Sequence, residues 1–175
     1  MPHPNRPTLP PRELGARLDK ILACAERLVA SLSAGALERG VPQGHGQVRD
    51  LAFQVFRRGL AYVDGMDMGV LPAAWLEETA PPDLIDGPAI ARYGALVRGR
   101  VSGWFEGAAA SEYARTIEVF DGPQNGHDLL ERMAVTVAQH LRRLRALGGE
   151  LDPLPADPLP LSVFEGLPLP ASPWQ

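Results

Sequence analysis

Four segments of the chain repeat apolar residues at intervals of three and four positions, and this pattern constrains the fold more than any other feature. The spacing gathers apolar side chains on one face of a helix. The predicted helices cover Arg12–Leu32, Gln47–Met68, residues 87–106 after an Asp86 cap, and His127–Leu147. Each helix must bury its apolar face, and four such helices do so most simply against one another. We therefore expect an all-α fold, a four-helix bundle.

The connections between these helices carry two further signals. Residues 71–87 are irregular and contain Pro81-Pro82, with a short helical turn expected near residues 73–77. A connection this long predicts a crossover rather than the short loop of an up-and-down bundle. The segment Tyr113–Phe120 is rich in β-branched and aromatic residues and is followed by Asp121-Gly122-Pro123, which predicts a short extended segment or hairpin.

Proline marks both ends of the chain. Five of the 18 prolines fall in residues 1–11 and seven in residues 151–175. Because proline cannot donate to a helix ladder, both ends are expected to be non-helical. The sequence thus divides into a Pro-rich extension (1–11), the bundle (12–151) and an extended Pro-rich arm (152–175). The arm is apolar enough to pack on the bundle, with Trp174 as an anchor.

Composition excludes several classes of protein. The 175 residues carry a net charge of −4, which argues against a protein that binds nucleic-acid backbones. No run of 18 apolar residues occurs, so no membrane partner or span is expected. The start of the chain lacks the features of a secretory signal, and the single cysteine, Cys24, cannot form a disulfide within the chain. A cytoplasmic protein is expected.

His140 is the most informative candidate for chemistry, because it lies on the inner stripe of the last helix, one turn after Thr136. Two histidines at this spacing form a metal clamp, but threonine is a poor ligand for zinc or nickel. We interpret His140 on its own as a hydrogen-bonded histidine of the bundle. Gln54, near the buried face of the second helix, is either a hydrogen-bonding group in a pocket or a boundary residue facing solvent, and periodicity leaves both open.

Other chemically capable residues have simpler interpretations. Cys24 lies on an apolar face and is expected to be a small buried hydrophobe. Asp64 and Asp67 are three residues apart but are interpreted as a solvated helix end, and His127 as a surface residue at a helix start. No phosphate-binding loop, dinucleotide fingerprint, cysteine pair or nucleophile elbow occurs.

Two stretches of the sequence resemble the DinB/YfiT-like superfamily. Residues 49–57 and 61–67 are similar to its second helix, and residues 129–132 and 138–144 to its metal-bearing helix. The similarity extends over most of residues 12–175, through Trp75-Leu76, Ala91-Arg92-Tyr93, Tyr113-Ala114-Arg115-Thr116 and Gly166-Leu167-Pro168-Leu169-Pro170. It is strongest to a branch of DinB-like domains that is sometimes fused to a glutaredoxin.

This resemblance implies a bundle with a crossover, often a homodimer, that holds zinc or nickel with three histidines and activates a low-molecular-weight thiol. The positions of the three ligands fall on Gln54, Thr136 and His140, so only one histidine remains. One imidazole with an amide and a hydroxyl is a weak donor set for a transition metal. We expect a degenerate metal site and no cofactor, with a weakly bound divalent ion (zinc or nickel) as the alternative.

Three functions are compatible with these residues. In the first, Gln54, Thr136 and His140 line a pocket for a small organic ligand, and His140 catalyses a metal-free proton transfer, isomerisation or cyclisation. In the second, the chain is a metal-dependent low-molecular-weight-thiol S-transferase. In the third, it is a non-catalytic dimeric interaction or stress-associated protein. An open cavity on the order of a few hundred Å³ at these residues would count against the third.

Overall fold

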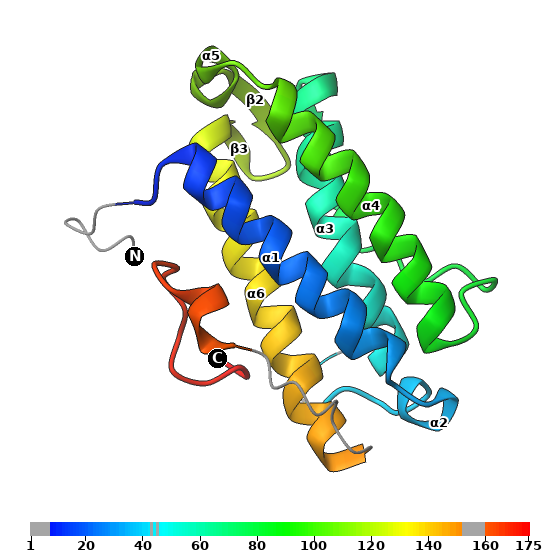
Figure 1. Ribbon diagram of the computed structural model, residues 1–175. Coiled ribbons are helices and arrows are strands. Elements are labelled where there is room, and N and C mark those ends of the chain that lie inside the picture. Colours follow the sequence, from blue (N-terminus) through cyan, green and yellow to red (C-terminus); the bar gives the residue numbers. More distant parts are fainter. Residues whose placement is uncertain (1–7, 43, 45, 152–159) are drawn as a thin grey trace.

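The computed structural model describes residues 8–42, 44, 46–151 and 160–175. Its long helices are α1 (Pro11–Ala30), α3 (Val48–Met68), α4 (Gly87–Gly107) and α6 (Gly126–Leu151). Helices α1 and α3 each pack against both α4 and α6, which closes a four-helix bundle (Figure 1). The expected all-α bundle is confirmed, and α1 begins one residue earlier than expected because proline is tolerated in the first helical turn.

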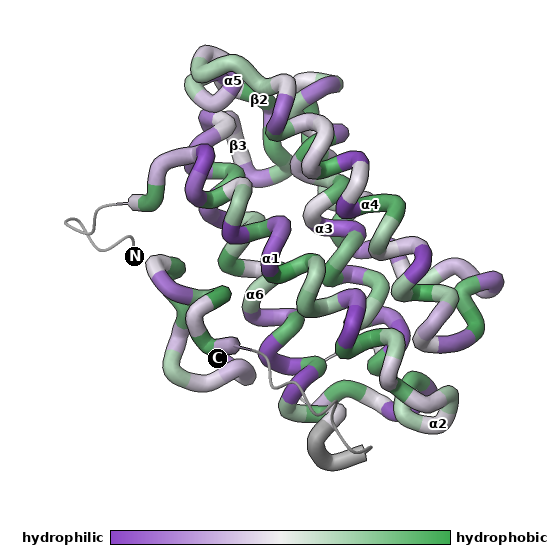
Figure 2. Tube along the Cα trace, in the orientation of Figure 1, coloured by the Kyte–Doolittle hydropathy of each residue, from purple (hydrophilic) through white to green (hydrophobic). Residues whose placement is uncertain are grey.

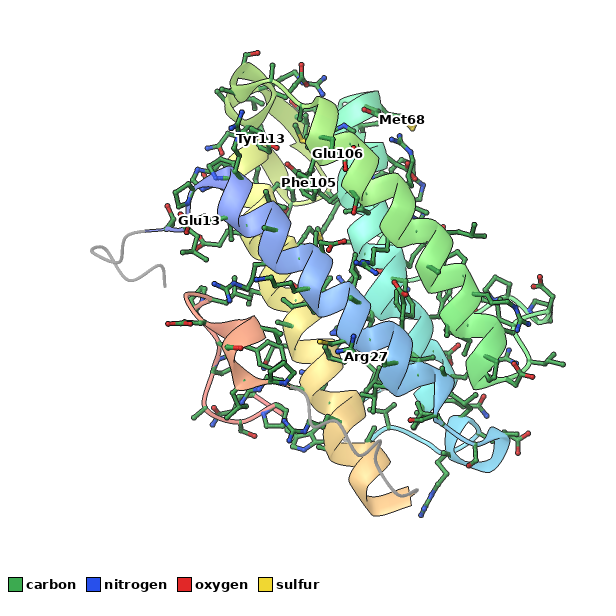
Figure 3. The ribbon with its side chains drawn as sticks, viewed as in Figure 1. Glu13, Arg27, Met68, Phe105, Glu106 and Tyr113 are labelled. Atoms are coloured by element: carbon green, nitrogen blue, oxygen red, sulfur yellow. The ribbon has the colours of Figure 1, made fainter. Side chains whose placement is uncertain are left out.

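The core is built from the apolar faces that the periodicity predicts. Hydrophobic residues recur between hydrophilic ones along α1, α3 and α6 (Figure 2). Tyr62 of α3 is fully buried and donates a 3.2 Å hydrogen bond to the Gly126 carbonyl, and burial raises its pKa. Its ring stacks on Phe105, with 6.0 Å between centroids. Phe105 and Tyr113 lie at the end of the bundle that carries α5 (Figure 3).

Helices α3 and α4 run in the same direction, so the chain must return along the bundle between them (Figure 1). The expected crossover is present, and it includes the short 3-10 helix η1 (Ala73–Leu76). The crossover ends at Gly87, where the start of α4 packs against the C-terminal end of α1. A side chain at Gly87 would place Cβ 2.3 Å from the Val29 carbonyl oxygen, so only glycine fits this contact.

A small sheet covers one end of the bundle. Strands β2 (Thr116–Val119) and β3 (Gly122–Asn125) form an antiparallel hairpin, as the sequence predicts. The hairpin starts later than expected, because Tyr113 belongs to a short helix, α5 (Ala110–Ala114). A third strand, β1 (Val70–Leu71), pairs in parallel with β2. Two residues are too few for a detectable periodic signal, and the same holds for the four-residue helix α2 (Ala34–Leu37).

The C-terminal segment lies on α6 and includes the 3-10 helix η2 (Leu161–Phe164). Arg142 donates to the carbonyls of Pro170 (2.7 Å) and Ala171 (2.9 Å), and Arg143 donates to that of Pro173 (2.7 Å). Most of the Pro-rich extension (1–7) and the first part of the arm (152–159) lie outside the described residues. Within the described ranges, no helix combines the length and hydropathy that crossing a bilayer requires.

Candidate functional site

Helix α3 presents a row of polar side chains to the crossover segment. Gln54 is buried, and its side-chain amide nitrogen donates to the backbone carbonyl of Glu78. One turn earlier, the Ala80 backbone N–H donates to the Asp50 carboxylate at 3.0 Å. Arg57 forms a two-point ion pair with the Glu78 carboxylate (2.6 and 3.1 Å). Gln54 therefore helps to fasten the crossover to α3, and its own Oε1 is shielded from solvent and has no hydrogen-bond partner in the described ranges.

Thr136 and His140 lie one turn apart on α6, which runs antiparallel to α3 (Figure 1). The Thr136 hydroxyl donates to the carbonyl of Arg132 at 2.8 Å, within its own helix. The Nδ1 atom of His140 is shielded and has no hydrogen-bond partner among the described residues. Burial, followed by the nearby positive charges of Arg58 and Arg143, lowers the pKa of His140 to about 3. The ring is therefore neutral at physiological pH.

Arg58 brings a positive charge to the contact between these helices. It lies one turn after Gln54, and its Nη2 donates to the Leu76 carbonyl at 3.3 Å. Its Nε is shielded from solvent, and no described residue offers it a hydrogen-bond acceptor. In the part of the chain that the structure describes, no carboxylate forms an ion pair with Arg58. Burial, with the charges of Arg132 and Arg143, lowers the pKa of Arg58, as expected for a cation that lacks a counter-ion.

A cavity of about 250 Å³ lies beside Arg58, between α3, α6 and η1. Four of its lining side chains are polar or charged, namely Arg58, Glu77, Arg132 and Thr136. The other four are apolar, namely Ala73, Leu76, Phe120 and Met133. Of the three residues singled out from the sequence, Thr136 lines this cavity. Gln54 and His140 belong to the same pair of helices, but they are not among its lining residues.

The residues at the positions that the resemblance assigns to metal ligands do not fit a transition metal. The Gln54 amide nitrogen and the Thr136 hydroxyl both donate to backbone carbonyls, and His140 supplies one imidazole. The guanidinium groups of Arg58 and Arg143 make the surroundings of His140 positive, which opposes binding of a divalent cation. Across the described ranges, no group of three His, Cys, Asp or Glu side chains is arranged to hold a metal ion.

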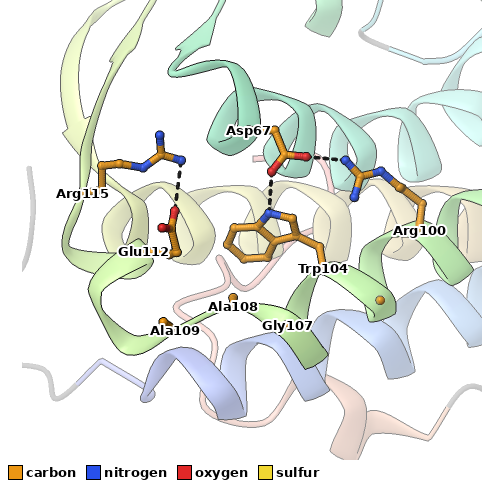
Figure 4. A pocket seen from close by; sticks show the side chains of 9 residues that line it. Asp67, Arg100, Trp104, Gly107, Ala108, Ala109, Glu112 and Arg115 are labelled. Atoms are coloured by element: carbon orange, nitrogen blue, oxygen red, sulfur yellow. Dashed lines mark hydrogen bonds and ion pairs between the residues drawn. The ribbon is translucent and has the colours of Figure 1, made fainter.

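A larger and more open cavity, of about 640 Å³, lies beside α4 (Figure 4). Its charged side chains neutralise one another. Asp67 pairs with Arg100 and accepts a 2.9 Å hydrogen bond from the Trp104 indole, and Glu112 pairs with Arg115 at 3.2 Å. Asp67 is exposed near the end of α3, as expected for a solvated helix end, and in addition it binds two side chains of α4. Because its charged side chains pair with one another, this cavity leaves fewer unpaired groups for a ligand to bind than the cavity beside Arg58.

Sequence reasoning missed Arg58, although a signal for it was present. Asp50, Gln54 and Arg58 recur at intervals of four, so they form a polar row beside the apolar stripe of α3.

Cys24 is buried, as expected, and its Sγ lies 3.4 Å from an Arg27 nitrogen. His127 is not a simple surface residue, because its Nε2 lies 2.8 Å from the Leu9 carbonyl oxygen.

Comparison with known proteins defines the class of this fold. The crystal structure of a DinB-like protein, YjoA from Bacillus subtilis, superposes with a TM-score of 0.63, and the match covers 82% of this chain and 95% of that one. The fold is therefore DinB-like. Identity over the match is 14%, so the likeness concerns the fold alone. No family model matches the sequence, and no curated protein matches it.

Proposed function

We propose that this DinB-like chain binds a small organic molecule, without a metal, in the cavity between α3, α6 and η1. The observation that carries the proposal is the cavity itself, with about 250 Å³ beside a partly buried arginine that has no ion pair within the described residues. A site that mixes apolar walls with a few polar groups is typical of small-molecule binding. The volume lies slightly below the usual range for drug-sized ligands, so a small ligand fits best.

His140 is better suited to hydrogen bonding than to proton transfer in this proposal. A general base works best when its pKa lies near the operating pH, and the pKa of His140 is about 3. His140 also lies outside the lining of the cavity, so no contact with the ligand is assigned to it. The proposed function is therefore binding, without a catalytic step assigned to His140. An S-transferase that depends on a metal is less well supported, because the donors do not fit the ion.

The proposal is tested by NMR on protein carrying ¹³C-labelled methionine methyl groups. The chain has four methionines, and of these Met133 lines the cavity. A set of small organic fragments should shift the Met133 signal, whereas the exposed Met68 serves as an internal reference. Ala73→Trp should fill the cavity and abolish the shifts. Ala74→Trp is the matched control, since Ala74 is exposed on the same short helix and does not line the cavity. Fragments that bind both variants equally would refute the proposal.

A further inference from the structure

Three guanidinium groups lie in or near the cavity, and of these Arg58 is the one whose donors are left incompletely paired among the described residues. Within the part of the chain that the structure describes, Arg58 has one long hydrogen bond, from Nη2 to the Leu76 carbonyl, and a shielded Nε without a partner. Arg132 at the same cavity is already neutralised by Asp121, with 2.8 Å between the charged atoms. Arg143, near Arg58, donates to a backbone carbonyl of the C-terminal segment. Two of the three guanidinium groups therefore lack a carboxylate partner among the described residues.

A partly buried cation without a counter-ion is costly, and an anion that binds beside it offsets part of that cost. A guanidinium presents its donors as a planar fork that matches the two oxygens of a carboxylate. The one acidic side chain on the wall, Glu77, is exposed and forms no ion pair with Arg58. The rest of the wall includes apolar side chains: Met133 is buried, Leu76 is partly buried, and Phe120 is half exposed, with the Arg132 guanidinium 5.3 Å from its ring centroid.

From this arrangement we infer that the ligand of the cavity is a small organic carboxylate, whose anionic end pairs with Arg58 and whose apolar body lies against Leu76, Phe120 and Met133. This inference rests on the proposed function and adds the chemical class of the ligand. Neutral His140, one turn beyond Thr136, adds no charge to the site. Arg58 is therefore the residue that distinguishes an acid from its neutral analogue.

The test compares two probes of nearly equal shape, benzoate and benzamide, by titration of the Met133 methyl signal. Benzoate is expected to bind about tenfold or more tightly than benzamide, because a charge-assisted pair replaces a neutral hydrogen bond. Arg58→Met should remove this preference, and Arg58→Lys should retain part of it. Arg92→Met is the charge-matched control, since Arg92 is exposed on α4, and it should leave both affinities unchanged.

The outcomes separate this inference from the proposed function. If benzamide binds as tightly as benzoate at Met133, or if Arg58→Met keeps the preference for benzoate, the carboxylate inference is overturned while binding in the cavity stands. If neither probe nor any fragment shifts Met133 in the wild-type protein, both proposals fail. The comparison of the two probes on the unmodified protein remains decisive even if Arg58→Met does not fold.

Discussion

The protonation of His140 should make the protein measurably less stable in weak acid. The pKa of this ring falls from its ordinary 6.5 to about 3 in the folded state, because the partly buried ring is desolvated and lies near the positive charges of Arg58 and Arg143. Between these values the unfolded chain binds a proton that the folded chain does not, so stability is complete above pH 6.5 and is lost as the pH falls. From these pKa values, His140 alone should cost about 2 kcal/mol between pH 7 and pH 5.

The assay is urea unfolding at both pH values for the wild type, His140→Leu and a control, His127→Gln. The drop in unfolding free energy on acidification should be smaller in His140→Leu by about 2 kcal/mol, and unchanged in the control. Comparing variants removes the contribution of the carboxylates, which titrate in all three proteins. Equal drops in the wild type and His140→Leu would show that His140 is not held neutral by its surroundings.

Further variants test the packing and the metal-ligand positions that the resemblance implies. Gly94→Ala should destabilise the protein by about 1–3 kcal/mol in urea unfolding, since the new methyl group would lie 2.4 Å from the Phe56 ring of α3. Gly103 faces open space, so Gly103→Ala is the control and should stabilise the protein slightly. An unchanged free energy of unfolding in Gly94→Ala would contradict the close contact. Tyr62→Phe should lose about 1–2 kcal/mol in the same assay, because a buried backbone carbonyl loses its donor, and no loss would show that this hydrogen bond contributes little. If the resemblance assigns the ligand positions correctly, Gln54→His with Thr136→His should create zinc binding that calorimetry detects and that the wild type lacks; no gain would mean that these positions do not converge with His140.

The helices and the crossover could be predicted from the sequence, because their signals are local. Apolar spacing defines α1 and α6, and Gly69 with Pro72 marks the end of α3. The pairing of β1 with β2 could not be predicted, since it joins residues nearly 50 positions apart through two short strands.

The sequence shows which helix faces carry the candidate residues, but it does not show which groups those residues contact. Periodicity identifies which face of a helix a residue occupies, so Gln54, Thr136 and His140 were found on the facing helices. It does not show which backbone carbonyl satisfies a polar side chain, and both Gln54 and Thr136 donate to carbonyls. The importance of Arg58 depends on the lack of a nearby carboxylate in the described structure, which is a tertiary property.

The most direct measurement is the location of a bound fragment by nuclear Overhauser effects between its protons and the protein's methyl groups. Binding in the cavity between α3, α6 and η1 predicts contacts to the methyl groups of Met133, Leu76 and Ala73. Contacts to the other cavity, at Ala108 and Ala109 beside α4, with none to Met133, would contradict the account.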